Sequence, residues 1–230
     1  MKPRNTYDEC ADQYVAMVQE RNECFDSDPL APAFFDLIGD VDGLKALDAG
    51  CGEGFVAREL TARGAEVTAI DISAPLVKVG RSKDAEGKID YRVCDLSEPL
   101  PEFEGHFDLV ASHVVLNDVP DFRGFIRTIG SLTTPDARAV FSLNNPYSAF
   151  RREKATSYFA SGEAVIYQGM AGVGVEVYYY HRTMEEYITA FRESGFLLRS
   201  LVDVLPPKDK PSREKWNEIP PLMVLEFVKR

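Results

Sequence analysis

Short apolar runs alternate with helical patterns along the first two-thirds of the chain. The runs fall at residues 46–47, 67–70, 89–93, 107–111 and 139–143. Helix-like stretches separate most of them, and parallel strands need crossover connections that are usually helices. The alternation therefore predicts an α/β fold in which helices cover a mostly parallel sheet.

Three of the predicted helices have recognisable boundaries. Apolar side chains recur between residues 121 and 132 at the spacing of one helical stripe. Thr183 followed by Glu186 reads as a capping box, and Gly195 closes the helix that it begins. Ser73 is a third N-cap, placed just before a proline. These helices are long enough to cover a sheet.

The carboxyl-terminal part departs from the alternation. Two apolar runs, at residues 196–202 and 222–228, are joined by a polar, proline-rich connection with no helical pattern. Strands without a crossover helix between them pair antiparallel. The sheet is therefore predicted to end in an antiparallel pair.

Two segments lie outside the repeating units. Residues 5–20 carry apolar side chains at helical spacing and predict an amphipathic lead-in helix. Residues 145–181 are rich in aromatic side chains, and either a substrate lid or a small packed subdomain explains that density equally well. The aromatic residues of this insertion are Tyr147, Tyr158, Phe159, Tyr167, Tyr178, Tyr179 and Tyr180.

Composition narrows the range of partners. The 230 residues are 45% hydrophobic and carry a net charge of −11. Such a chain can bury one substantial core, but it lacks the positive field that a nucleic acid or an anionic membrane requires. No stretch approaches the ~18 apolar residues of a membrane span, and the four cysteines and three histidines show no metal-ligand spacing. We expect a cytoplasmic protein without a metal site.

The strongest chemical signal is a glycine loop between a strand and a helix. Residues 47–54 read Leu-Asp-Ala-Gly-Cys-Gly-Glu-Gly, and glycines let a ligand approach the main chain near a helix amino end. Asp71 ends the next strand, 21 residues after Gly50, where a carboxylate can accept both hydroxyls of a ribose. Asp95 follows the third strand at the same edge of the sheet. Together these residues predict a nucleoside site.

The loop also indicates which nucleoside is bound. Its Gly-x-Gly-x-Gly spacing differs from the Gly-x-Gly-x-x-Gly of dinucleotide folds, which disfavours a nicotinamide-dependent oxidoreductase. Glu53 lies inside the loop, and the loop contains no lysine or arginine. A pyrophosphate would meet added negative charge there, whereas a cationic nucleoside would not.

These motifs resemble those of the class I S-adenosylmethionine-dependent methyltransferases, in particular the small-molecule branch similar to the ubiquinone and menaquinone C-methyltransferases. Residues 47–54, 67–73, 94–96 and 107–112 look like the family's first four motifs. The resemblance implies S-adenosylmethionine as the cofactor and a Rossmann-like, seven-stranded, mostly parallel sheet with an antiparallel last strand. It also implies a single domain with four parts: an N-terminal helical lid (1–40), a cofactor-binding core (41–144), a substrate-cap insertion (145–181), and a C-terminal helix and strand pair (182–230).

The resemblance assigns roles to individual residues. The loop glycines would face the methionine portion, Asp71 the ribose and Asp95 the adenine, while Asp48 would orient the loop. The cofactor-binding residues implied in this way are Tyr14, Asp48, Gly50, Cys51, Gly52, Asp71, Ile72, Cys94, Asp95, Leu96 and Ser112. The residues expected to face the acceptor are His113, Asn117, Tyr147, Tyr167 and Tyr179.

One departure from the family concerns the catalytic base. Relatives often carry Leu-His-x-Val after the fourth strand, where residues 116–119 of this chain read Leu-Asn-Asp-Val. Asn117 cannot act as a base, so His113 is the nearest ionisable candidate, and histidine ordinarily titrates near ~6.5. The alternative is that His113 is a hydrogen-bonded residue of the core or rim.

The sequence thus predicts methyl transfer from S-adenosylmethionine to a small, aromatic or partly apolar acceptor by in-line displacement. The protein would be a monomer or a homodimer. One alternative is a module that binds the cofactor without transferring its methyl group, or an enzyme of different chemistry on the same fold.

Overall fold

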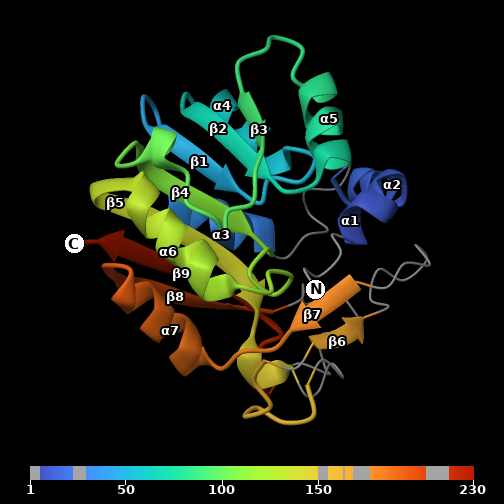
Figure 1. Ribbon diagram of the computed structural model, residues 1–230, viewed down its shortest axis with the longest axis vertical. Helices are drawn as coiled ribbons and strands as arrows, with labels where there is room; N and C mark the ends of the chain where they lie inside the picture. Colours follow the sequence, from blue (N-terminus) through green and yellow to red (C-terminus); the bar gives the residue numbers. More distant parts are fainter. Residues whose placement is uncertain (1–5, 23–29, 150–154, 163, 168–176, 206–217) are drawn as a thin grey trace.

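The structure is a computed structural model that describes residues 6–22, 30–149, 155–162, 164–167, 177–205 and 218–230 (Figure 1). Its centre is a seven-stranded sheet with the strand order β3-β2-β1-β4-β5-β9-β8. The strands are β1 (Lys45–Ala49), β2 (Glu66–Asp71), β3 (Asp90–Val93), β4 (Phe107–His113), β5 (Thr133–Asn144), β8 (Phe196–Val204) and β9 (Leu222–Lys229).

The strand directions confirm the predicted sheet. The strands from β3 to β5 are all parallel, whereas β9 runs antiparallel to both β5 and β8. The strand order reverses between β1 and β4, which pair directly. In an open α/β sheet, ligands bind outside the carboxyl ends of the strands at such a switch point.

Helices cover both faces of this sheet, as the alternation predicted. One apolar layer holds side chains of α3 (Leu30–Ile38), α4 (Phe55–Ala62) and α5 (Ala74–Lys83) against the sheet. The opposite layer holds those of α6 (Phe122–Leu132) and α7 (Met184–Glu193), which Figure 1 shows on one side of the strands. Successive residues of the strands alternate between the layers: Ala46 faces the first and Leu47 the second.

The predicted helix starts are also confirmed. Thr183 and Glu186 form the capping box of α7, in which each side chain pairs with the other residue's backbone N–H. Ser73 Oγ accepts the N–H of Leu76 at the start of α5. These caps fix where the chain enters each helix and therefore where the preceding loop reaches the sheet edge.

The amino-terminal region differs from the single helix expected over residues 5–20. The structure has two helices there, α1 (Thr6–Glu9) and α2 (Ala11–Asn22), with a bend at Cys10. Figure 1 shows both beside α5, and Asp8 accepts a hydrogen bond from Ser73 Oγ at 2.8 Å. In α3, by contrast, Phe34 and Ile38 are fully buried in the core, so this helix is a layer of the fold.

The insertion contains a second, two-stranded sheet. Its antiparallel strands are β6 (Ala164–Tyr167) and β7 (Val177–Tyr180), near the carboxyl edge of the main sheet (Figure 1). The N–H of Tyr180 donates to the carbonyl of Asn117 at 2.7 Å, which joins β7 to the loop after β4. No helix in the described part of the chain has the length and apolar character needed to cross a bilayer.

Candidate functional site

The glycine loop after β1 leaves its main chain bare. Gly50 has a φ of 81°, which L-amino acids with side chains rarely adopt, and a Cβ there would lie 2.5 Å from Cγ2 of Val115. The N–H groups of Gly50 and Cys51 donate to the carbonyl of Ile70 at 2.8 and 3.0 Å, so the loop is anchored to β2. Gly50 therefore has both a backbone and a packing reason to be glycine.

Asp71 binds this loop from the end of β2. Its Oδ2 accepts the N–H of Gly52 and its Oδ1 accepts the N–H of Ser73, both at 2.8 Å. Burial raises the pKa of the Asp71 carboxyl, and these two donors act in the opposite direction. The carboxylate lines the cavity described below.

Two further acids of the loop region point into the protein. Asp48 is buried, and its Oδ2 accepts the N–H of Ala57 at 2.9 Å. Burial raises the pKa of Asp48 to about 8. Glu53 is also buried and forms ion pairs with Arg58 and Lys83. The expectation that Glu53 adds negative charge to the ligand side is therefore wrong, because its charge is neutralised between α4 and α5.

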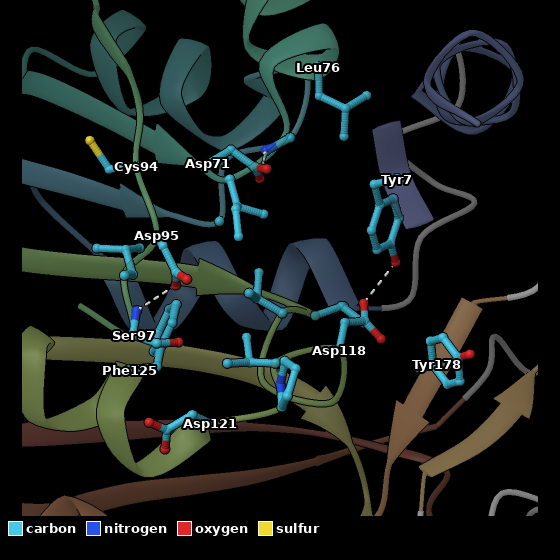
Figure 2. Close-up of a pocket in the computed structure, with 18 of the residues that line it drawn as sticks. Tyr7, Asp71, Leu76, Cys94, Asp95, Ser97, Asp118, Asp121, Phe125 and Tyr178 are labelled. Carbon is cyan, nitrogen blue, oxygen red and sulfur yellow. Dashed lines mark hydrogen bonds between the residues drawn. The ribbon is translucent and has the colours of Figure 1, made fainter. Parts of the chain in front are cut away.

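A cavity of about 340 Å³ opens at the carboxyl edge of the parallel strands. Figure 2 shows its two ends: Asp71, Asp95 and Phe125 lie toward one side, Tyr7, Asp118 and Tyr178 toward the other, and Leu76 lies at the top of the view between them. Of the residues predicted to bind cofactor or acceptor, those that line it are Tyr14, Gly50, Gly52, Asp71, Ile72, Cys94, Asp95, Leu96 and His113.

The end of the cavity with Leu96 and Phe125 combines apolar walls with carboxylates. Asp95 Oδ1 accepts the N–H of Ser97 at 2.9 Å, and Asp121 Oδ1 accepts that of Gly124 at 2.8 Å. This surface can hold a flat heterocycle between apolar side chains while a carboxylate accepts from its amino group.

Tyrosines and one carboxylate form the opposite end. The Tyr7 hydroxyl donates to Asp118 Oδ2 at 2.8 Å, although the two residues are 111 positions apart in the chain (Figure 2). Burial, followed by the charge of Asp118, raises the pKa of Tyr7. The ring of Tyr14 meets that of Tyr7 edge-on, with centroids 5.5 Å apart, and Tyr178 and Tyr180 line the wall from β7.

His113, the last residue of β4, also borders the cavity. Its Nδ1 lies 2.8 Å from Ser142 Oγ on the neighbouring strand β5, and Ser142 Oγ accepts the N–H of Val114. The ring packs against Phe34 with centroids 5.0 Å apart. These contacts fix the orientation of the imidazole that was predicted as a base.

Three residues expected to contact the cofactor have their side chains elsewhere. Asp48 supports α4 as described, Cys51 Sγ is buried against its own loop, and Ser112 Oγ donates to the carbonyl of Ala49 at 2.8 Å. Ser112 does not line the cavity because β4 continues to His113, so its side chain packs within the sheet.

The acceptor residues also need correction. Asn117 and Tyr179 are buried, and Asn117 binds the Tyr187 hydroxyl through Nδ2 and the Asn144 N–H through Oδ1. Tyr147 is half exposed and stacks on Tyr158 away from the cavity wall. The side chain of Tyr167 lies outside the described residues.

Several cavity residues were missed from the sequence. The main ones are Tyr7, Val115, Asp118, Asp121, Tyr178 and Tyr180. Tyr7 is one of the side chains at helical spacing that predicted the lead-in helix over residues 5–20, and Asp118 stands beside the Asn117 that departs from the family motif. Both signals were present, but neither fixed a direction for the side chain.

Arg182 holds the loop that carries Asp118. The guanidinium is 3% exposed and donates to the carbonyls of Leu116 at 2.6 Å, Pro120 at 3.0 Å and Val119. It also lies 4.4 Å from the ring centre of Phe122. One buried side chain therefore satisfies three carbonyls of this loop and sets its path along the cavity.

The residues present fit an adenosyl sulfonium. A side-chain-free loop borders the cavity at Gly50 and Gly52, and carboxylates end the next two strands at the same edge. Residues 47–141 match a family model described as a methyltransferase domain. This segment is less than half of the chain, so the match shows a likeness to methyltransferase domains over the cofactor side of the fold. The residues that line the cavity fit S-adenosylmethionine as the cofactor.

Comparison with known proteins extends this result. The chain is 39% identical over 111 residues to a ubiquinone biosynthesis O-methyltransferase of Xanthomonas euvesicatoria, covering 47% of this chain and 46% of the relative. It is 35% identical over 119 residues to the Chromobacterium violaceum protein of the same name, covering 51% of each. The match thus spans about half the length of these relatives.

Solved structures share the fold over most of the chain. An S-adenosylmethionine-dependent methyltransferase from Mesorhizobium loti has a TM-score of 0.74 at 24% identity, covering 89% of this chain and 99% of its own. The Burkholderia thailandensis 1,6-didemethyltoxoflavin-N1-methyltransferase, solved with S-adenosylhomocysteine, has a TM-score of 0.61 at 20% identity, covering 96% and 87%.

Proposed function

We propose that this protein transfers the methyl group of S-adenosylmethionine to a small acceptor that is aromatic or partly apolar. The observation that supports this most directly is the single cavity, which joins the glycine loop and Asp71 to a second end lined by tyrosines, His113 and Asp118. A cofactor-binding module without a reaction would need only the first end. Methyl transfer needs both, because the acceptor must meet the cofactor inside one enclosed space.

The nucleoside end would hold the cofactor through main chain and carboxylates. Asp71 would accept the ribose hydroxyls and Asp95 would accept from the adenine amino group, since both carboxylates line the cavity. The methionine portion would lie along Gly50 and Gly52 beneath Tyr14, whose hydroxyl is 3.8 Å from the position that a Cβ on Gly52 would take. Tyr14 would then close the loop side of the site.

The other residues would position the acceptor and manage its proton. When bound, S-adenosylmethionine supplies a methyl carbon made electrophilic by the positively charged sulfur. The acceptor's lone pair forms the new bond to that carbon as the carbon–sulfur bond breaks and its electrons stay on sulfur. His113 would accept the acceptor's proton, and Val114 and Val115 would help to exclude water, since all three line the cavity. Positioning alone is worth up to about 7–11 kcal/mol in such reactions.

Transfer of a labelled methyl group tests this proposal. The full-length protein, incubated with methyl-labelled S-adenosylmethionine and a panel of small aromatic amines, phenols and acids, should label an acceptor and release S-adenosylhomocysteine. Calorimetry with S-adenosylhomocysteine gives cofactor binding independently. Tight binding of this product without label transfer to any acceptor would favour the non-catalytic alternative. The cytoplasmic location and the monomeric or homodimeric state stay predictions.

A further inference from the structure

The charge of the cavity wall is one-sided. The described residues that line it include aspartates and one glutamate but no lysine or arginine. The acids are Asp71, Asp95, Glu98, Asp118 and Asp121. Four of them follow β2 and β3 or begin α6, on the side assigned to the nucleoside. Asp118 is the carboxylate on the acceptor side.

Asp118 is held as an acceptor of hydrogen bonds. Tyr7 donates its hydroxyl proton to Oδ2 at 2.8 Å, and an ionised carboxylate offers about four lone-pair positions, so it can accept from several donors at once. Arg182 lies behind the same loop, but its guanidinium donates to the carbonyls of Leu116, Val119 and Pro120. The loop is thus braced by a cation on its protein side while its carboxylate stands at the cavity.

Aromatic rings surround this carboxylate. Tyr7 and Tyr14 come from α1 and α2, and Tyr178 and Tyr180 from β7, with the last two ring centroids 6.4 Å apart. Figure 2 shows Asp118 between Tyr7 and Tyr178. The faces of tyrosine rings attract cations, and rings gathered around a carboxylate are a recurrent way to bind an ammonium group.

We propose that the acceptor is an amine, that it enters as an ammonium ion, and that Asp118 holds its nitrogen among Tyr7, Tyr178 and Tyr180. This inference rests on the proposed function and names the substrate class of the same site. An anionic acceptor would meet five carboxylates and no positive side chain among the described lining residues. A neutral alcohol or phenol would forgo the charge attraction.

The chemistry of an amine acceptor balances with the residues present. The ammonium loses one proton to His113, which leaves a lone pair on nitrogen. That lone pair forms the nitrogen–carbon bond while the carbon–sulfur bond breaks with both electrons going to sulfur. Positive charge therefore moves from sulfur to nitrogen, and Asp118 is placed to stabilise it where it arrives.

The test compares three ligands with one skeleton: 2-phenylethylamine, 2-phenylethanol and 3-phenylpropionate. Each is titrated by calorimetry into the full-length protein saturated with S-adenosylhomocysteine. We expect the amine to bind at least about tenfold more tightly than the alcohol, and the acid to bind most weakly. Equal affinities, or tighter binding of the alcohol or the acid, would overturn the proposal.

Two variants assign the effect to its residues. Asp118→Asn keeps the shape of the side chain and should weaken the amine by about 10- to 100-fold, with the alcohol unchanged. Tyr7→Phe keeps the ring but removes the competing donor, so amine affinity should hold or rise. Asp203→Asn, which removes one exposed charge from β8, is the control for net charge. Unchanged amine affinity in Asp118→Asn, or loss of it in Asp203→Asn, contradicts the proposal.

The cofactor's own sulfonium is the other cation that Asp118 could serve. If Asp118→Asn weakens binding of S-adenosylmethionine more than that of S-adenosylhomocysteine, which lacks the sulfonium charge, and leaves the amine unaffected, the carboxylate serves the sulfonium and the inference fails. If the amine binds through Asp118 but no labelled methyl group is transferred, the proposed function fails instead. The two failures are therefore distinguishable.

Discussion

Asp71 Oδ2 accepts the backbone N–H of Gly52 at 2.8 Å, which ties the end of β2 to the glycine loop after β1. The other carboxylate oxygen accepts the N–H of Ser73, one residue before α5 begins. A single side chain therefore sets the geometry of the loop and faces the cavity. Loss of this carboxylate should affect both the shape of the loop and the ligand that it holds.

Replacing Asp71 by alanine should raise the Kd for S-adenosylhomocysteine by about 100-fold or more, because hydrogen bonds to a charged acceptor are worth about 1.5–3 kcal/mol each. Asp71→Asn should have a smaller effect, since the amide oxygen can still accept. Isothermal titration calorimetry measures both. Asp90→Ala removes an exposed acid at the start of β3 and should leave affinity intact. An unchanged Kd for Asp71→Ala would remove the ribose assignment.

Gly50→Ala should weaken cofactor binding by about tenfold or more. The new Cβ would meet the Val115 side chain at 2.5 Å, and the φ of 81° costs a residue with a Cβ about 1–2 kcal/mol. Adding Val115→Ala should recover part of the affinity by making room. Gly43→Ala is a matched control, because Gly43 has a φ of 72° but no atom near its Cβ position. No recovery in the double variant would show that the backbone cost dominates.

Asp48 should make the protein lose stability as the pH rises. Its folded pKa of about 8 lies above the ordinary 3.8, so between these values the folded chain holds a proton that the unfolded chain has released. The free energy of unfolding then falls by about 1.4 kcal/mol per pH unit from this group. Asp48→Asn cannot ionise, so its advantage over the wild type should grow from pH 5 to pH 8 in urea denaturation. Parallel pH curves for the two proteins would refute the buried, protonated carboxyl.

Arg182→Met should lower the free energy of unfolding by about 3 kcal/mol or more, since the carbonyls of Leu116, Val119 and Pro120 would lose a buried donor. Arg182→Lys keeps the charge with fewer donors, so its free energy of unfolding should lie between those of the wild type and Arg182→Met. Arg92→Met, which breaks an exposed pair with Asp90, should change the free energy of unfolding far less, because water screens exposed ion pairs. Chemical denaturation distinguishes these values, and equal costs for Met at both positions would contradict the bracing role.

His113→Asn should reduce kcat by about 10²- to 10⁴-fold, because it removes the group proposed as the base. Binding of S-adenosylhomocysteine should change little. Ser142→Ala removes only the partner of Nδ1 and should give a smaller loss. A turnover equal to the wild type would assign His113 to the rim of the cavity instead.

The features that could be predicted from the sequence are those that depend on residues close together in the chain. The capping box at Thr183, the N-cap at Ser73 and the strand that ends at Asp71 each depend on residues a few positions apart, and the structure confirms all three. Strand counting and the absence of a helix before the last strand also gave the antiparallel pair. Nucleoside-side residues such as Asp95 follow strands directly, so their position at the sheet edge could be predicted.

The acceptor side could not be predicted in the same way. The hydrogen bond between Tyr7 and Asp118 joins residues 111 positions apart, and no local pattern specifies such a pairing. The family resemblance assigned Ser112 to the cofactor, as a residue just after a fourth strand that was expected over residues 107–111. In the structure β4 runs to His113, so Ser112 lies within the strand and its Oγ donates to the carbonyl of Ala49. Successive side chains in a strand point to opposite faces, so a shift of the strand end changes which side chains can reach the cavity.

The bond between the Tyr180 N–H and the Asn117 carbonyl has a consequence for the diversification of this fold. The small β6–β7 sheet joins the catalytic framework through main-chain atoms, which are the same whatever side chains β7 carries. Tyr178 and Tyr180, which face the cavity from β7, can therefore be exchanged while the attachment persists. Substitutions on this one short strand would then admit new acceptors, with the nucleoside side of the cavity inherited intact.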